Sequence, residues 1–408
     1  MSERLLGRNY SWFIGSLLFI FPVVVNSVKV AGDLVLMILA ITGLFISIFY
    51  KTSPFLIKEL RLFNWLTLGY FAVVCISILF SGKALELAHF ISRELYFLFA
   101  PFVALAIFKA KINISVVLYG IKVGLIVLAA LVYVNVGSFD VRYSGSINAN
   151  PYGIIAAILT LFSIIRISKE NLINKIITLV VFMSGLLVTL SSGTRTAWIV
   201  LFIGILLYLW IAYLNKDFKG YLKFFAMFVL IGLLLNSFAK FPNMENRILS
   251  VKQQVISWIS SKDVTSSVAV RMEMWEASIK QIVQQPFLTG LGYRNGINAV
   301  IAKHADAKAQ PQIARYNHVH NTYLNHLLAE GVLGLIAILA LLFMPLRLFI
   351  ANIKSLDRQY YASMGVILIV SFAVFGFSNK LFGDVFINAF YVFYLSLLLP
   401  LVYKSSPP

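Results

Sequence analysis

Long apolar segments alternate with short polar ones along most of this chain. A helix needs about 20 mostly apolar residues to cross the hydrocarbon core of a membrane, and most of these segments approach that length. The pattern therefore predicts an all-α polytopic membrane protein with about twelve transmembrane helices. We expect them at residues 10–27, 31–49, 62–80, 90–108, 115–136, 151–165, 176–190, 197–213, 222–238, 324–346, 361–378 and 385–402.

Lysine and arginine residues gather in alternate connections between these segments. If the N-terminus faces the cytoplasm, the short inside connections carry 17 basic residues and the short outside loops carry five. Cytoplasmic loops hold an excess of Lys and Arg, so we predict that both termini are cytoplasmic. Arg4 and Arg8 precede the first apolar segment as in a signal peptide. No small-residue cleavage site follows, so we expect this segment to be retained as a helix.

The composition mainly excludes other classes of protein. The 408 residues are 60% hydrophobic and 12% charged, which is about half the charge expected of a soluble domain. A net charge of +18 would indicate nucleic acid in a soluble protein, but here its placement makes it chiefly an orientation signal. We therefore expect no nucleic-acid partner. The single cysteine, Cys75, excludes an intrachain disulfide and a cysteine metal cluster.

One polar connection is much longer than the others. It spans residues 239–322 on the predicted outside face, between transmembrane helices 1–9 at 1–238 and helices 10–12 at 323–408. Apolar residues recur at helical spacing around 248–259, and Arg271 to Gln285 has the pattern of a second helix. We expect these helices to pack on the bundle rather than lie on the membrane surface.

Two histidines lie at the end of this long outside loop. The sequence His318-Val319-His320-Asn321 comes directly before the tenth apolar segment, so its side chains should lie near the outer membrane boundary. Histidine is the side chain best suited to accept a proton near neutral pH. A polar helix cap, or a histidine pair bonded to lipid headgroups, is the alternative interpretation. A metal site is not expected, because no nearby carboxylate or thiol would complete it.

Two arginines on the outside face lie in polar motifs. Arg195 lies in Ser192–Ala197, where backbone N–H groups, hydroxyls and a guanidinium together suit a phosphate oxyanion. Arg271 shares a predicted helix face with Trp275. Contact with lipid phosphate is the alternative for Arg195, and salt bridges to Glu273 and Glu276 are the alternative for Arg271.

Other polar residues on the outside face suit sugar hydroxyls. Arg142 and Tyr143 precede Asn148-Ala149-Asn150-Pro151 in the loop before the sixth segment, although Gly and Asn-Pro there are also turn-forming. Arg93-Glu94 is predicted to be an intramembrane pair. No outside cluster of Asp and Glu could hold Mg²⁺ or Mn²⁺, so cationic side chains would have to stabilise a leaving diphosphate.

The order and sidedness of these motifs resemble those of the O-antigen ligases. That family belongs to a superfamily that also includes O-antigen polymerases and protein O-oligosaccharyltransferases. The resemblance covers the twelve-segment profile, the cytoplasmic termini and the long loop before the tenth segment. Locally it is carried by Ser192–Ala197, by Arg271–Trp275 with Pro286 and Gly290-Leu291-Gly292, by His318–Asn321, and by Gly331-Val332-Leu333-Gly334.

The resemblance implies a glycosyltransferase of lipopolysaccharide biosynthesis in the bacterial inner membrane, with a periplasmic active site. Such a ligase moves a polysaccharide from undecaprenyl diphosphate to a sugar hydroxyl of lipid A–core, without a metal or another cofactor. By motif, Arg195 and Arg271 match the arginines that hold the diphosphate. His320 matches the catalytic histidine and His318 a second family histidine. We expect His318, Asn321, Arg142 and Tyr143 to bind substrate. The implied partners are the lipid-linked polysaccharide, lipid A–core and membrane lipids, and the oligomeric state stays open.

The residues are suited to this chemistry. Arginines can neutralise the leaving diphosphate, and a neutral histidine can take the proton of the acceptor hydroxyl. Direct displacement without a carboxylate nucleophile would invert the anomeric centre.

Two alternatives remain open at this stage. An O-antigen polymerase would use a second lipid-linked chain as acceptor, but the His318–His320 pair favours a ligase. A polysaccharide or lipid transporter would also have about twelve spans. Transporters tend to show repeats and polar, broken helices near the midplane, whereas the polar residues here lie mostly at one outer face.

Overall fold

Helices account for eleven of the twelve predicted segments. The computed structural model describes residues 7–80, 91–137, 142–145, 147–222, 225–226, 252–260, 264–285, 288–292 and 297–403. The long helices are α1 (Arg8–Val24), α2 (Ala31–Phe49), α3 (Lys58–Phe80), α5 (Leu95–Ala110), α6 (Ser115–Val136), α7 (Ala149–Ser163), α8 (Leu172–Ser191), α9 (Arg195–Leu214), α15 (Thr322–Asn352), α16 (Gln359–Gly376) and α17 (Val385–Tyr403).

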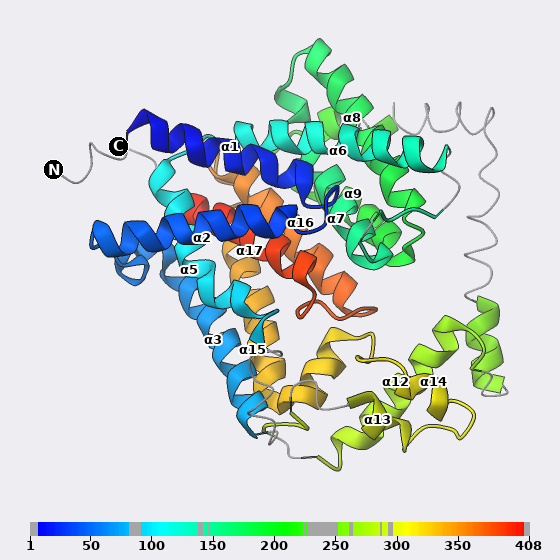
Figure 1. The fold of residues 1–408 in the computed structure, drawn as a ribbon. Helices are drawn as coiled ribbons and strands as arrows, with labels where there is room; N and C mark the ends of the chain where they lie inside the picture. Colours follow the sequence, from blue (N-terminus) through cyan, green and yellow to red (C-terminus); the bar gives the residue numbers. More distant parts are fainter. Residues whose placement is uncertain are drawn as a thin grey trace.

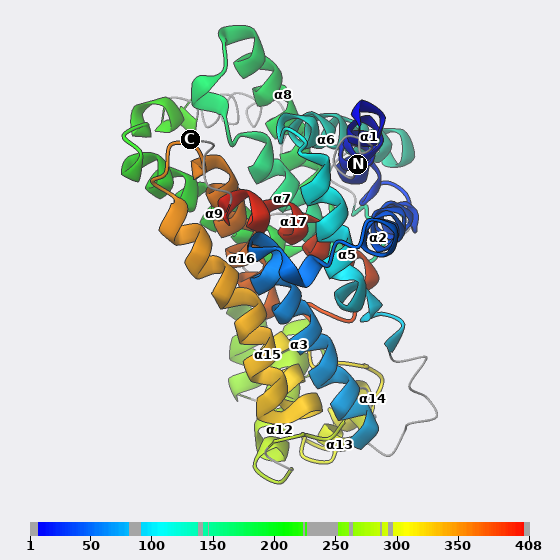
Figure 2. The ribbon, with the colours of Figure 1, turned by 90° about the vertical axis from the view of Figure 1, so that its left-hand side faces the viewer.

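The predicted fold class is confirmed. Nine helices within the described ranges are long and apolar enough to cross a membrane, and α1 and α5 are shorter apolar helices. The same ranges contain no strand. The predicted segment at 222–238 lies almost entirely outside the described residues, so the count of twelve stays a prediction. α1 begins and α17 ends on the left-hand side of Figure 1, and Figure 2, which looks onto that side, shows them apart from each other.

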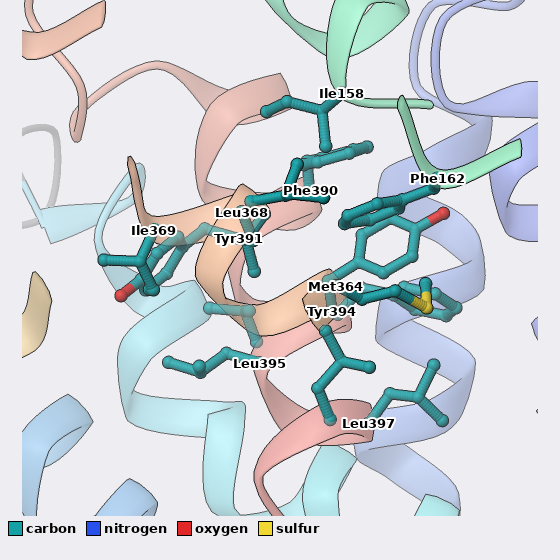
Figure 3. Close-up of a cluster of buried hydrophobic side chains, with 14 of the residues drawn as sticks. Ile158, Phe162, Met364, Leu368, Ile369, Phe390, Tyr391, Tyr394, Leu395 and Leu397 are labelled. Carbon is teal, nitrogen blue, oxygen red and sulfur yellow. The ribbon is translucent and has the colours of Figure 1, made fainter. Parts of the chain in front are cut away.

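The core of the bundle is built around α7 and α17. Both helices are apolar on every side and almost fully buried, as expected of helices surrounded by others. Figure 3 shows Ile158 and Phe162 of α7 against Phe390 and Tyr394 of α17. The rings of Phe162 and Tyr394 meet edge to face with centroids 5.1 Å apart, a favoured aromatic geometry. This rigid centre fixes the ends of the helices that carry the polar residues.

The long outside segment forms a small helical unit of its own. It contains a helix at 252–260, α12 (Ser267–Ile282), α13 (Ile297–Ala302) and α14 (Gln310–Ala314). Figures 1 and 2 show α12, α13 and α14 grouped at the level of the lower ends of α3 and α15. Their apolar side chains, with Met274 and Ile301 at the centre, pack together and against Leu328 of α15. The segment is therefore joined to the bundle through α15.

The predicted start of α12 was wrong by one turn. The helix begins at Ser267 rather than Arg271, because Ser266 caps it. The Ser266 Oγ accepts a hydrogen bond of 3.1 Å from the backbone N–H of Ala269, which satisfies one of the free N–H groups at a helix start. Arg271 consequently lies within the helix and not at its end.

The tenth predicted segment is not one straight helix. Gly331 interrupts α15 with φ 65° and ψ −155°, a backbone conformation that favours glycine. The break frees carbonyl groups in the turn before it. The Leu328 carbonyl accepts a 2.7 Å bond from the N–H of Leu291, and the Ala329 carbonyl accepts a 2.8 Å bond from the N–H of Gly292. The Gly290–Gly292 segment thus replaces the missing helical hydrogen bonds.

Gly290 and Gly331 face each other so closely that neither position has room for a side chain. A Cβ atom on Gly290 would lie 2.5 Å from the Leu328 carbonyl oxygen, and one on Gly331 would meet the backbone of Leu288. Both glycines also have positive φ. We refer to this contact as the glycine junction. It fastens the segment that follows α12 to the break in α15.

Candidate active site

A polar cavity of about 590 Å³ opens where the outside segment meets the bundle. Its lining comes from four separate parts of the chain and includes Arg93, Asn148, Asn150, Asn298, Tyr316, Asn317, His318, His320, Asn379, Lys380 and Asp384. These residues lie at the ends of α5, α7, α16 and α17, in α13 and in the segment before α15. Amide and charged side chains on one cavity suit a ligand with many hydroxyl groups or anionic oxygens.

His320 lies in the wall of this cavity with a strained backbone. Its φ of 51° lies in the left-handed region, which costs a non-glycine residue about 1–3 kcal/mol and is common at functional sites. Burial and the neighbouring charge of Arg271 lower the pKa of His320 from 6.5 to about 4, against a smaller opposing effect of the Asn379 side chain. The imidazole is therefore neutral at pH 7 and able to accept a proton.

The neighbours of His320 hold it from both sides. The indole Nε1 of Trp275 donates a 2.9 Å bond to the carbonyl of Val319. Asn298 donates to the carbonyl of His318 over 3.4 Å. On the other side, the Asn321 Oδ1 accepts from the N–H of Leu324 at 3.1 Å and caps α15. Asn321 thus acts as the polar helix cap considered from the sequence.

Arg271, Arg195 and His320 come together although they lie far apart in the sequence. Burial lowers the pKa of Arg271, the Arg195 guanidinium lowers it further, and Tyr316 raises it. Arg271 in turn lowers the pKa of His320. Two positive charges this close to each other repel, and an anion between them would relieve the repulsion. One cationic group is therefore built from three parts of the chain: the first residue of α9, the second turn of α12 and the segment before α15.

The two acidic residues beside Arg271 are engaged elsewhere. The carboxylate of Glu273 accepts bonds from the Trp258 indole at 3.0 Å and from the N–H of Asp306 at 2.9 Å. Glu276 pairs with Lys280 at 2.9 Å. These hydrogen bonds and this ion pair give the two glutamates a structural role within the outside segment. Among the described ion pairs, none joins either glutamate to Arg271.

The hydroxyls of the Ser192–Ala197 motif serve the turn and not a ligand. Ser192 and Thr194 are buried. The Ser192 Oγ accepts from the N–H of Thr194 at 3.1 Å, and the Thr194 hydroxyl donates to the Ala149 carbonyl at 2.8 Å. The expectation that these two hydroxyls would face a phosphate was therefore wrong. Their contacts fix the turn that precedes Arg195, the first residue of α9.

Arg142 and Tyr143 are not among the described residues that line the cavity. The Arg142 Nε donates to the carbonyl of Ser192 at 3.2 Å. The N–H of Tyr143 donates to the carbonyl of Ser191 at 2.9 Å. Both residues brace the turn that precedes Arg195. In the same loop Asn148 and Asn150 do face the cavity.

His318 lies in the cavity wall beside His320, with ring centroids 4.2 Å apart. Its Nδ1 is 2.5 Å from the Asn317 side-chain oxygen. The two histidines thus share one wall but differ in their contacts. The Asn317 side chain contacts His318, whereas the charge of Arg271 adds to the burial that lowers the pKa of His320.

Sequence analysis missed the contribution of the loop between α16 and α17. Asn379 accepts a 2.8 Å bond from the Asn150 side chain and lies against His320. Asp384 caps α17, and burial raises its pKa against the opposing effects of backbone N–H groups, Arg93 and Lys380. The polar run from Ser378 to Lys380 at the outer end of two apolar segments was the available signal.

The predicted Arg93–Glu94 intramembrane pair has a different arrangement. Both residues precede α5, which begins at Leu95. Arg93 donates over 3.5 Å to the carbonyl of Gly383 and lines the cavity. Glu94 is buried beside Asn388. Among the residues with described positions, no group of three His, Cys, Asp or Glu side chains could hold a metal ion.

Comparison with known proteins decides the family. Residues 178–339 match the family model described as O-antigen ligase. This segment is an O-antigen ligase family domain. The match confirms the resemblance to the O-antigen ligase superfamily that was predicted from the sequence. The matched domain contains Arg195, Arg271, His318, His320 and Asn321.

A related protein of Haemophilus influenzae (strain ATCC 51907 / DSM 11121 / KW20 / Rd) is 27% identical over 257 residues. The alignment covers 60% of this chain and 62% of that relative, whose description is "uncharacterized protein". The cavity is also lined by residues outside the matched domain. Asn148 and Asn150 precede it in the sequence, and Asn379 and Asp384 follow it.

Proposed function

We propose that this protein is an O-antigen ligase. It would transfer a polysaccharide from undecaprenyl diphosphate to a sugar hydroxyl of lipid A–core, on the periplasmic face of the bacterial inner membrane. The observation that carries the proposal is that Arg195 acts on the charge of Arg271, and Arg271 on that of His320, which lines a polar cavity. The two arginines are not among the described residues that line this cavity. Two cations and a neutral base are the groups that this transfer requires.

In the proposed reaction Arg195 and Arg271 hold the diphosphate of the donor. The guanidinium group binds two phosphate oxygens at once, and two such groups can neutralise the negative charge that grows on the leaving diphosphate. Arg271 is largely buried and raised in energy by Arg195, so a bound anion would relieve their repulsion. The arginines would take the part that a metal ion plays in other transferases, which makes the proposed reaction metal-independent.

His320 would act as the general base. The acceptor hydroxyl attacks the anomeric carbon, the bond from that carbon to the diphosphate oxygen breaks, and the hydroxyl proton passes to His320. This single displacement inverts the anomeric centre. The charge of Arg271 is one cause of the low pKa of His320. A diphosphate bound to Arg271 would cancel part of that charge and so make His320 a stronger base when the donor is in place.

The cavity would hold the sugar ends of the two substrates. Asn148, Asn150 and Asn379 offer amide groups that both donate and accept hydrogen bonds, as sugar hydroxyls require. His318 lies in the same wall and is proposed to bind substrate there. Asn321, Arg142 and Tyr143 would support the site from behind, since their described contacts are with the backbone around it.

A deletion strain tests the proposal against the polymerase alternative. Its lipopolysaccharide would be run on a gel, and undecaprenyl-linked polymer would be measured in the same cells. A ligase predicts loss of capped lipid A–core while long lipid-linked polymer accumulates. Loss of the long polymer itself would mean that the protein is a polymerase.

A further inference from the structure

A second cavity lies at the other end of the bundle, where α6 and α8 meet. Its volume is about 270 Å³. Ser115 and Lys122 of α6 line it, as do Arg166 and Glu170 from the connection between α7 and α8. This connection and the start of α6 lie at the opposite helix ends from the candidate active site. We propose that this cavity binds a phospholipid with an anionic headgroup.

The polar end of the cavity holds two cations, and a described ion pair neutralises only one of them. Lys122 is neutralised, because its Nζ lies 2.7 Å from the carboxylate of Glu170. It also donates a 2.6 Å bond to the hydroxyl of Thr178. Arg166, in contrast, forms no ion pair with a carboxylate within the described ranges. Its Nη1 donates to the Ser115 hydroxyl at 3.0 Å, and its Nε is buried without an acceptor.

The Arg166 guanidinium is also held in place for a ligand. It lies over the ring of Tyr360 at 5.0 Å from the ring centroid, a cation–π contact that fixes the plane of the group. An orphaned buried N–H costs free energy unless an acceptor reaches it. A phosphate oxygen would supply that acceptor and the missing negative charge together, and the guanidinium fork suits phosphate geometry.

The remaining walls of the cavity are apolar and open toward the lipid. Val123, Ile126 and Ile177 line it and are each more than one third exposed on the helix surface. Such a wall suits an acyl chain lying along α6 and α8. A headgroup pocket with a basic residue between transmembrane helices is the arrangement by which membrane proteins hold anionic lipids. A phospholipid would fit both the polar end and the apolar wall of the cavity, with its phosphate at Arg166 and an acyl chain along Val123.

Native mass spectrometry of the detergent-purified full chain tests this inference. The protein is incubated with equal amounts of phosphatidylglycerol and phosphatidylcholine, and the lipids retained on it are counted. The native protein should retain phosphatidylglycerol preferentially. Arg166→Gln should reduce that retention roughly tenfold, since a charged hydrogen bond accounts for at least that factor. Val123→Trp should reduce it without changing any charge, by filling the acyl wall.

Arg358→Gln is the matched control. Arg358 lies between α15 and α16 at the same end of the bundle, bonds to Asn352 at 3.2 Å and does not line the cavity. Its variant should retain phosphatidylglycerol as the native protein does. Equal retention of the two lipids by the native protein would overturn the inference. So would native-like retention by Arg166→Gln, or equal losses in the Arg166 and Arg358 variants.

Discussion

Buried cations occur at both ends of this bundle, and the two groups differ in how their charge is balanced. At one end Lys122 lies 2.7 Å from Glu170, with 15% and 17% of the two side chains exposed. At the other end Arg271 is surrounded by Arg195, Tyr316 and His320. The Lys122–Glu170 pair balances its own charges, whereas Arg195 and Arg271 bring together charges of the same sign.

The difference separates structural charge from functional charge. A buried ion pair with an added hydroxyl contact satisfies itself and needs no ligand. Arg195 and Arg271 place two positive charges near each other, and the charge of Arg271 adds to the burial that keeps His320 neutral, so a bound anion would favour this group. Burial alone therefore does not mark a candidate functional residue in this protein, whereas like charges brought together near a polar cavity do.

Among the variants that test this comparison, His320→Ala should reduce saccharide transfer the most. Loss of the general base is expected to lower transfer from an undecaprenyl-diphosphate-linked saccharide to lipid A–core by about 100- to 10,000-fold, while the protein stays folded. The measurement is an in vitro transfer assay with purified protein. His304→Ala is the control, because His304 bonds to Gln281 and does not line the cavity. Native activity in the His320 variant would sink the assignment.

Arg195→Lys and Arg271→Lys should come next in size. Each variant keeps the positive charge but loses the two-pronged contact with phosphate, so transfer should fall on the order of tenfold to a hundredfold. The same assay with varied donor concentration would measure the loss. Arg315→Lys, an exposed position in the same outside segment, should leave transfer unchanged. Equal rates for all three lysine variants would contradict a role in diphosphate binding.

The pH dependence of kcat/KM gives a smaller but more specific effect. This parameter reports the free enzyme, in which the pKa of His320 is lowered to about 4. The neutral, active form therefore persists as the pH falls through 6.5, and activity should be lost only as the pH approaches 4. Because bound diphosphate offsets the charge of Arg271, kcat should fall at a higher pH than kcat/KM. A decline of both centred on pH 6.5 would disagree with this environment.

Lys122→Met should have the smallest effect on activity. It leaves Glu170 without its cation, which should cost about 1–3 kcal/mol in the free energy of unfolding, measured by denaturation in detergent. Transfer by the folded fraction should stay at the native rate. The double variant Lys122→Met with Glu170→Gln should recover much of the lost stability, because no buried charge is left unpaired. Loss of transfer in the folded double variant would place this pair in the catalytic machinery.

Length and polarity along the sequence were enough to predict most of the fold. The bounds predicted for α2 and α6 agree with the structure, because each apolar run is closed by polar residues at both ends. The sequence also contained the elements of the site, since Arg195, Arg271 and His320 each lie in a polar motif on the predicted outside face. Their meeting depends on that common sidedness.

The sequence could not predict contacts made between distant backbones. An apolar run around Gly331 has the same periodicity whether the helix is straight or broken, so the break in α15 left no pattern. The hydroxyls of Ser192 and Thr194 look equally able to bind phosphate or to hold a turn. Asn379 lies in the polar run from Ser378 to Lys380, but that run does not reveal that Asn150 and His320 reach it from other parts of the chain.

The glycine junction also holds the loop that carries the two histidines of the candidate site. Gly290 and Gly331 lie on either side of this loop, which contains His318 and His320, and their contact closes it. Without the contact, the carbonyls of Leu328 and Ala329 would lack the N–H groups of Leu291 and Gly292. A substitution at either glycine would therefore reach the two histidines through the backbone of this loop.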